Sequence, residues 1–328
     1  MMRALLLSGV VLACLTLPAG AFDCAKATTE TEKLICSDDQ LKALDDKLGE
    51  HWSTMKGDFS KQAWQAMLTS QRAWLKQRDA RCANGSDQER AGCLKAETQN
   101  RIDTFAVAHR SGPGPSGEIV PLGILSDGGP RGYKVEFQGL QFFKPVQPGE
   151  LALNAIVHKL MDEAPVEEKV DFDPPGGTLD YMQSLEVTYA SPELISVTAH
   201  TSRYDGGAHP NRYSASYNVH MQDGELKFPE VFRPDAVVQL SKMCFERLAR
   251  PGGDRLTAQE RRDSLFEPKA ESLREVVGNL SAWAYTEDGA TVLFPPYAIG
   301  PYAAGDFECQ LPLKTLKALT VQPRYLPY

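Results

Sequence analysis

Residues 111–117 read Ser-Gly-Pro-Gly-Pro-Ser-Gly, and this stretch divides the 328-residue chain into two parts of different character. Proline and glycine at this density disfavour both helix and strand, so the stretch is predicted to be a linker. Before it, apolar residues recur with helical spacing, and after it they alternate as in strands. We therefore predict a helical domain over residues 22–110 and an α+β domain over residues 118–328.

The segment before the linker carries apolar residues three, four or seven positions apart, at Leu34, Leu41, Leu44, Leu48 and Trp52. A second stripe covers 64–75 and a third covers 94–105, with the turn sequence Asn-Gly-Ser-Asp at 84–87 between them. Such spacing gives each helix one apolar face. The sequence thus predicts a small all-α domain, nearly neutral in charge, with 13 basic and 14 acidic residues over 22–105.

After the linker, several short runs alternate between apolar and polar side chains, which predicts strands. These runs cover 133–137, 185–189, 195–199, 213–219, 291–294 and 307–313. Helical periodicity interrupts them at 151–161, 236–248 and 269–280. Strands and helices grouped in this way predict an α+β domain with an antiparallel sheet.

The first 21 residues have the pattern of a secretory signal peptide. A basic start is followed by an apolar run over 4–17, and small residues then predict cleavage after Ala21. The alternative is a lipoprotein with Cys14 lipidated, although Leu12 is bulky for such a site. No later apolar run approaches the length of a membrane span. We therefore expect a periplasmic or otherwise extracytoplasmic protein with no transmembrane segment in the mature chain.

Removal of the leader leaves six cysteines, and an even number in an oxidising compartment predicts three disulfides. They are Cys24, Cys36, Cys82, Cys93, Cys244 and Cys309. Proximity in sequence favours pairing the first two and the next two, which leaves the last two for each other. Metal binding by these thiols is the alternative, but the sequence lacks CxxC spacing.

The mature chain has 34 basic and 43 acidic residues, a formal charge of −9. This charge makes nucleic acid and anionic membrane poor partners and favours neutral or cationic ones. The sequence has no HExxH motif, no GxSxG elbow and no glycine-rich phosphate loop. The spacing of His200, Asp205 and His209 matches no familiar set of metal ligands. We therefore predict a protein that is not an enzyme and holds no metal or cofactor.

Four cysteines and a Gln-Arg-Ala-Trp run characterise the segment 22–105. The pattern comprises Asp23–Ala27, Glu32–Cys36, Leu41, Leu44-Asp45, Gln71–Leu75, Arg78-Asp79-Ala80 and Cys82. In this pattern the segment resembles the N-terminal domain of the LprI-type lysozyme inhibitors. The resemblance implies a disulfide-stapled helical domain associated with lysozyme inhibition.

Two motifs rich in glycine and proline characterise the second part. Residues 204–211 read Tyr-Asp-Gly-Gly-Ala-His-Pro-Asn, and residues 294–305 read Phe-Pro-Pro-Tyr-Ala-Ile-Gly-Pro-Tyr-Ala-Ala-Gly. Over about 118–320 the chain resembles the extracytoplasmic domain shared by the lysozyme-sensing anti-sigma factor RsiV and some peptidoglycan deacetylases. The sequence shows neither the deacetylase catalytic domain nor the membrane helix of the anti-sigma factor. The resemblance therefore implies a ligand-binding domain without those activities.

Both motifs supply candidates for contact with a partner. A Gly-Gly pair between two strands permits a tight loop, and prolines around tyrosines give rigid aromatic surfaces. The predicted partner-binding residues are Tyr204, Asp205, Gly206, Gly207, His209, Asn211, Tyr297 and Tyr302. The alternative interpretation makes His209 a buried packing residue that ties the loop together, and packs the two later tyrosines against the sheet.

Two functional hypotheses follow from different classes. The first is an exported binding protein that captures a lysozyme-type muramidase and occludes its cleft, aided by attraction between an acidic inhibitor and a basic enzyme. The second is a cell-wall glycan-binding module or peptidoglycan-processing accessory protein, whose aromatic side chains stack on sugar rings. An envelope scaffold without either activity is a third possibility. Salt dependence separates the first two, since a charge-driven complex weakens with ionic strength.

Overall fold

The computed structural model describes residues 23–109, 117–127, 133–165, 179–248, 270–299, 302 and 306–328. The predicted leader, its cleavage site after Ala21, the alternative lipid site Cys14 and linker positions 111–116 lie outside these residues. Among the described helices, none combines the length and apolar character needed to cross a membrane.

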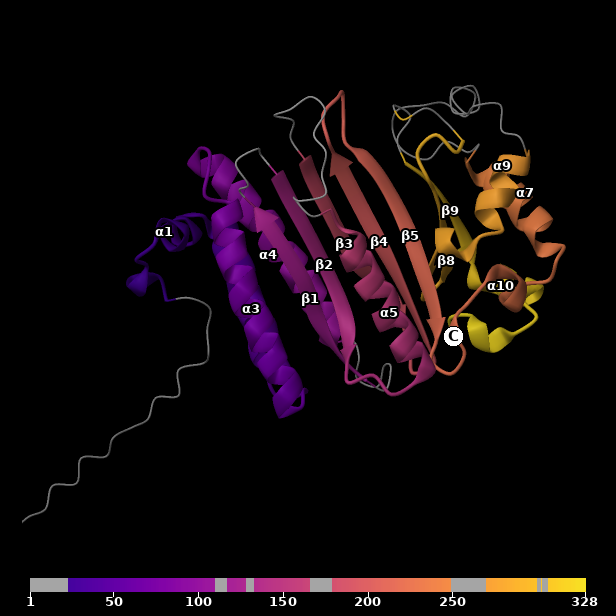
Figure 1. Cartoon of the computed structure of the whole chain (residues 1–328), viewed down its shortest axis with the longest axis horizontal. Coiled ribbons are helices and arrows are strands. Elements are labelled where there is room, and N and C mark those ends of the chain that lie inside the picture. Colours follow the sequence, from indigo (N-terminus) through magenta and orange to yellow (C-terminus); the bar gives the residue numbers. More distant parts are fainter. Residues whose placement is uncertain are drawn as a thin grey trace, which may run out of the picture.

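The N-terminal part is helical, as predicted (Figure 1). Its elements are η1 (Cys24–Lys26), α1 (Glu30–Ser37), α2 (Asp39–Met55), α3 (Lys61–Arg81) and α4 (Asp87–His109). The first predicted stripe is divided between α1 and α2 because the Asp38 carboxylate accepts a 3.0 Å hydrogen bond from the amide of Leu41 and caps the second helix.

All three predicted disulfides are present. Cys24–Cys36 ties the start of the chain to α1, and Cys82–Cys93 closes the corner between α3 and α4. Cys244–Cys309 joins two elements of the C-terminal part, α7 (Ala236–Leu248) and β9 (Phe307–Pro312). Each bond limits the freedom of the unfolded chain and so stabilises the folded one.

A six-stranded sheet in the order β1-β2-β3-β4-β5-β6 forms the centre of the molecule (Figure 1). Its strands are β1 (Glu118–Asp127), β2 (Tyr133–Phe143), β3 (Leu179–Ala190), β4 (Leu194–Tyr204), β5 (Asn211–His220) and β6 (Gly224–Glu225). Neighbouring strands are antiparallel, as predicted, except that β2 and β3 run parallel. The exception arises because α5 (Pro148–Glu163) carries the chain back along the sheet between them.

A second, three-stranded antiparallel sheet packs beside the first. It consists of β7 (Trp283–Thr286), β8 (Gly289–Phe294) and β9, and its surroundings include α6 (Phe228–Val231), α7, α9 (Ala270–Val277), η3 (Leu280–Ala282), α10 (Leu313–Leu319) and η5 (Pro323–Tyr325). Trp283 and Tyr285 are fully buried in its core. The side-chain amide of Asn218 on β5 donates to the carbonyl oxygens of Leu280 and Trp283, at 3.1 and 2.9 Å, and so joins the two sheets.

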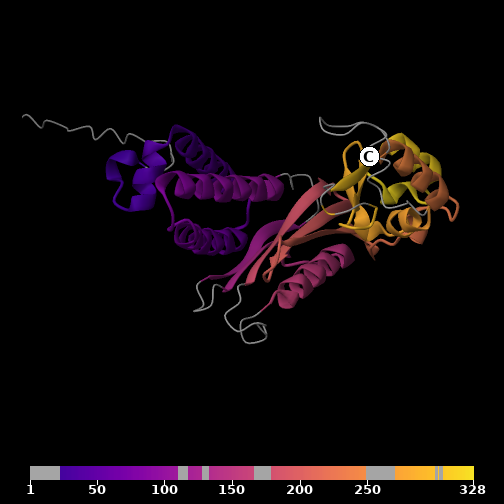
Figure 2. The same cartoon turned by 90° about the horizontal axis from the view of Figure 1, so that it is seen from above.

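The helical part is packed against the sheet at β1 (Figure 2). Val120 of β1 and Phe143 of β2 belong to the same apolar cluster as the buried helical residues. Ser60 donates hydrogen bonds to the Glu118 carboxylate through its amide and its hydroxyl. The two parts of the chain therefore share an apolar cluster and polar contacts.

Candidate functional site

The β4–β5 connection has the tight geometry that its Gly-Gly pair predicts. Gly206 and Gly207 have φ angles of +102° and +110°, which L side chains rarely adopt. The Tyr204 hydroxyl donates to the carbonyl of Gly207 across the turn, at 3.1 Å. Asp205 accepts from Nε of Arg203 at 3.1 Å, and Asn211 is exposed at the start of β5. The loop thus projects beyond the end of the sheet.

The two predicted motifs meet at this loop. The His209 ring stacks on the Tyr302 ring with centroids 3.8 Å apart and planes 10° from parallel. The Tyr302 hydroxyl donates to the carbonyl of Pro210 at 2.9 Å, although these residues are 92 positions apart. His209 is exposed, so the alternative that made it a buried packing residue is wrong.

Tyr297 completes an aromatic surface with these rings. Its side chain is 56% exposed and its ring centroid lies 6.0 Å from that of Tyr302. Its φ angle of +67° is unusual for a residue other than glycine and costs about 1–2 kcal/mol. Strain at an exposed residue is more common at contact sites than elsewhere. We call His209, Tyr297 and Tyr302 the aromatic platform.

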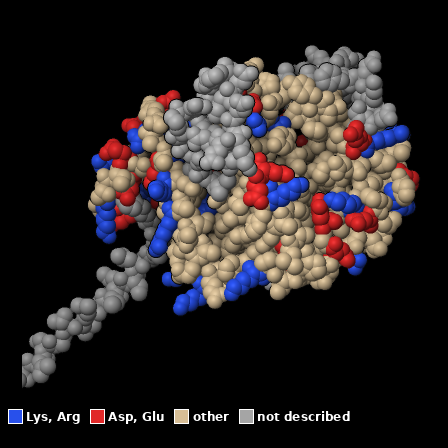
Figure 3. Space-filling view, in the orientation of Figure 1, with Lys and Arg blue, Asp and Glu red and all other residues tan. Residues whose placement is uncertain are grey.

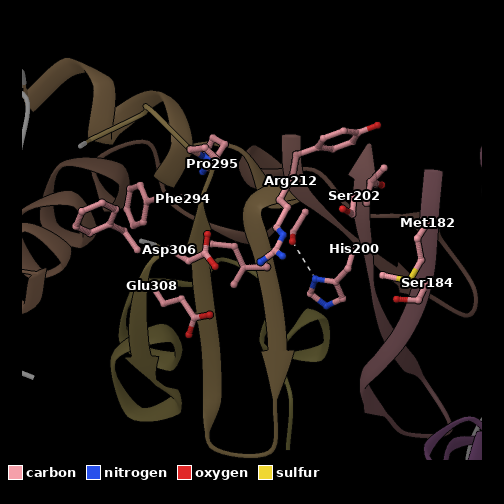
Figure 4. A pocket seen from close by; sticks show the side chains of 15 residues that line it. Met182, Ser184, His200, Ser202, Arg212, Phe294, Pro295, Asp306 and Glu308 are labelled. Atoms are coloured by element: carbon pink, nitrogen blue, oxygen red, sulfur yellow. Dashed lines mark hydrogen bonds between the residues drawn. The ribbon is translucent and has the colours of Figure 1, made fainter. Parts of the chain in front are cut away.

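A groove of about 330 Å³ adjoins the platform and lies between the two sheets (Figure 4). Its lining includes Met182, Ser184, His200, Ser202, Arg212, Tyr213 and Ser214 from the large sheet, and Phe294, Pro295, Pro296, Asp306, Phe307 and Glu308 from the small one. Met182 and Tyr213 are 39% and 48% exposed, which is high for large apolar side chains. The groove therefore offers apolar contact together with charged and hydroxyl groups.

A line of polar side chains crosses three strands beside the groove. His200 Nδ1 lies 2.9 Å from Ser214 Oγ, and His200 Nε2 lies 3.3 Å from Glu186 Oε2. The hydrogen bond to His200 lowers the pKa of Glu186 against the opposing effect of burial. The side chains of His200 and Glu186 are 43% and 65% exposed, unlike a catalytic pair, whose carboxylate is buried.

The structure separates His200 from the other residues considered for a metal. His200 bonds to side chains of β3 and β5, whereas Asp205 pairs with Arg203 and His209 stacks on Tyr302. Within the part of the chain that is described, no group of three or more potential ligands is close enough to hold a metal ion.

Apart from His200, which was considered as a metal ligand, the groove residues were not among the sequence-based candidates. Alternation along β5 places Arg212 and Ser214 on one face, a signal that the sequence does contain. The register that sets His200 opposite Ser214 depends on strand pairing, and the approach of Asp306 from the small sheet depends on tertiary packing. Neither can be read from local pattern.

Comparison with known proteins matches two segments of the chain to different families. Residues 24–105 match the family described as "Lysozyme inhibitor LprI", and residues 229–314 match a "Protein of unknown function (DUF3298)". The first match confirms the resemblance of the helical part to lysozyme inhibitors. The second match includes Tyr297 and Tyr302 but begins after the loop that carries His209.

Solved structures of two DUF3298 proteins are similar to this chain. One, from Bacteroides fragilis, is 14% identical, with 64% of this chain and 95% of that chain covered and a TM-score of 0.46. The other, from Pseudomonas aeruginosa, is 15% identical, with 65% and 97% covered and a TM-score of 0.44. No curated protein matches the chain.

Proposed function

We propose that this is an extracytoplasmic protein that binds a lysozyme-type muramidase and inhibits it by occluding the cleft. The observation that carries the proposal is the match of residues 24–105 to the lysozyme-inhibitor family. The aromatic platform supports it, because an exposed, pre-formed aromatic surface is well suited to a partner's concave site. Three disulfides support a location in an oxidising compartment.

The platform supplies the contact that occlusion needs. Tyr302 is held by its hydrogen bond to Pro210 and by stacking on His209, so little conformational freedom remains to be lost on binding. Tyr297 projects beside it with more than half of its side chain exposed. In this proposal the two tyrosine rings enter the sugar-binding cleft and exclude substrate.

The negative charge of the protein speeds its association with a basic enzyme more than it strengthens the final complex. The formal charge is −9 without the leader, and it attracts a basic enzyme over a distance of about 8 Å at physiological ionic strength. On the face seen in Figure 3, acidic and basic side chains are interspersed. We therefore expect salt to slow association while the apolar contacts of the platform persist.

We also propose that the protein acts by binding rather than by catalysis. The Ser214–His200–Glu186 line is exposed to water, so its histidine lacks the buried carboxylate that orients a catalytic base. The interstrand hydrogen bond between His200 and Ser214 gives this line a structural role on the sheet face.

Inhibition of a basic lysozyme in a cell-wall lysis assay tests the proposal. The protein from residue 22 onward is titrated at low and high salt, alongside Tyr297→Ala and Tyr328→Ala. Tyr328 is a suitable control because its side chain is 65% exposed and lies outside the platform. We expect stoichiometric inhibition by the parent, at least tenfold weaker inhibition by Tyr297→Ala as for an interface anchor, and no change for the control.

Absence of both inhibition and direct binding with several lysozyme classes would rule the proposal out. Equal inhibition by all three proteins would place the contact away from the platform.

Glycan binding is the second candidate, favoured by the groove beside the platform. Its polar strand residues lie next to the exposed ring of Tyr213, a combination suited to a sugar ring. Binding of chitin oligosaccharides that is insensitive to salt, without lysozyme inhibition, would favour this function.

A further inference from the structure

A cavity of about 420 Å³ lies between the helical part and the large sheet. Helices α3 and α4 form one wall, and β1 and β2 form the other. Trp74 and Leu122 supply apolar surface, and hydroxyl and amide side chains lie among them. The volume falls within the range of small-molecule sites. The strand wall lies outside both segments that match known families, 24–105 and 229–314.

Arg101 places a positive charge in the helical wall, where its side chain is only 7% exposed. Its Nε donates to Gln71 at 2.9 Å and its Nη2 donates to Ser70 at 3.1 Å, so both partners are neutral. The guanidinium lies over the rings of Trp74 and Phe105, at 5.5 and 4.7 Å from their centroids. No carboxylate of the described residues forms an ion pair with it.

The carboxylates that line the cavity are already engaged by another arginine. Arg81 pairs with Glu97 of α4 at 3.4 Å and with Glu136 of β2 across the cavity. Both carboxylates are therefore paired with Arg81. Among the described residues, no carboxylate is left as a counter-ion for Arg101.

Arg78 adds a second donor to the same wall. It is 5% exposed and pairs with Asp79 at 2.9 Å. Its Nη1 forms an ion pair with Asp45 at 3.8 Å, which is too long for a hydrogen bond, and it has no hydrogen-bond partner. A buried guanidinium N–H without an acceptor is costly, and an acceptor in the cavity would remove that cost.

Burial also acts on the protonation of Arg101. It lowers the pKa of the guanidinium to about 9, so the group is still charged at neutral pH. An uncompensated buried charge is among the most unfavourable features of a folded protein. The cavity thus combines room for a ligand with a cation that pairs with no carboxylate of the described part of the chain.

We propose that the cavity binds a small molecule bearing an oxyanion, a carboxylate or a phosphate, held by Arg101 and Arg78. Guanidinium groups bind both oxyanions through paired N–H donors. The body of the ligand lies against Trp74, which favours a planar or apolar group. Because such a ligand touches both walls, its binding stabilises the contact between the helices and the sheet.

Titration calorimetry on the protein from residue 22 onward tests this site with acetate, benzoate, inorganic phosphate and phenyl phosphate. Ionic strength is held constant with chloride, which serves as the reference anion. We expect benzoate to bind at least tenfold more tightly than acetate, or phenyl phosphate to bind at least tenfold more tightly than inorganic phosphate, or both. A response to carboxylates alone or to phosphates alone would support the site and identify its oxyanion.

Two variants keep the test independent of folding defects. Arg101→Gln removes the charge and is expected to weaken binding at least tenfold. Ala73→Phe adds bulk at an exposed helical position that lines the cavity, so it blocks the site without disturbing the core. Arg212→Gln, in the groove between the sheets, is the control and is expected to bind like the parent.

Absence of binding by all four probes would overturn the proposal. Unchanged affinity in both Arg101→Gln and Ala73→Phe would also overturn it, since the anion would then bind elsewhere. Neither result bears on lysozyme inhibition, because the cavity and the platform use different residues.

Discussion

Asn218 shows how one buried side chain fixes the relation between two sheets. It is 1% exposed, and its amide donates to two main-chain carbonyls that precede and begin β7. Those carbonyls lie in the interior, where water cannot replace the lost donor. The residue stands in a strand that alternation predicts, but its partners are 62 and 65 positions away and no local pattern reveals them.

Replacement of Asn218 by Ala is expected to lower the free energy of unfolding by about 1–3 kcal/mol, because it leaves buried acceptors unpaired. Urea denaturation measures the change. Asn211→Ala, at the exposed start of the same strand, is the control and is expected to change stability by less than about 0.5 kcal/mol. Equal effects of the two variants would contradict the linking role of Asn218.

The platform residues were visible in the sequence, whereas their arrangement was not. Glycine at 206 and 207 predicts a tight loop, and tyrosine among prolines predicts a rigid surface. The contact between His209 and Tyr302 joins loops from different sheets, so it depends on how those sheets pack. For the same reason the sequence could not decide whether His209 is buried or exposed.

At the scale of elements, prediction succeeded where one periodicity ran without interruption. Strands β3, β4 and β5 contain the predicted runs, although each strand extends beyond its run. Strand β1 was not predicted, because Pro121 and Gly123 interrupt it and both disfavour strand. Proline is tolerated there because β1 is an edge strand. The parallel pairing of β2 and β3 follows from the path of α5 and has no local signature.

Helix α1 offers a prediction about pH. The Glu32 carboxylate accepts hydrogen bonds from the amides of Thr29 and Thr28, and these lower its pKa from 4.5 to about 2. Because the pKa of Glu32 is lower in the folded state, its ionised carboxylate stabilises the fold. This stabilisation is complete above about pH 4.5 and is lost as the pH falls towards 2.

We therefore expect Glu32→Gln to reduce the loss of thermal stability between pH 5 and pH 2.5, because the variant has no carboxylate to protonate. Circular dichroism at 222 nm gives the midpoints. Glu50→Gln, at an exposed position of α2, is the control and is expected to follow the parent. A parent-like pH dependence in Glu32→Gln would show that other groups govern this transition.

At the scale of the whole molecule, the helical part and the sheet are not independent. Val120 and Phe143 belong to the apolar cluster of the helices, and Arg81 pairs with Glu136 of β2. Composition predicts a boundary near residue 112, but the contacts between the two parts cannot be deduced from composition. The same packing creates the cavity between the two parts.

The fragment 118–328 is therefore expected to self-associate at concentrations where the longer protein keeps a constant sedimentation coefficient. Removal of the helices uncovers Val120 and Phe143 beside the edge strand β1. Sedimentation velocity over a concentration series compares the fragment with the protein from residue 22 onward. Concentration-independent sedimentation of the fragment would show that the helices are dispensable for the sheet.

The contact of α3 with β1 also bears on how such a chain could arise by fusion. An open strand edge can pair with another chain and so lead to aggregation. A helical module that lies against β1 and covers Val120 and Phe143 removes the apolar surface beside that edge, whatever else the module binds. Exchange of this module for an unrelated one would therefore require a new cover for β1, which constrains the combinations of domains that remain soluble.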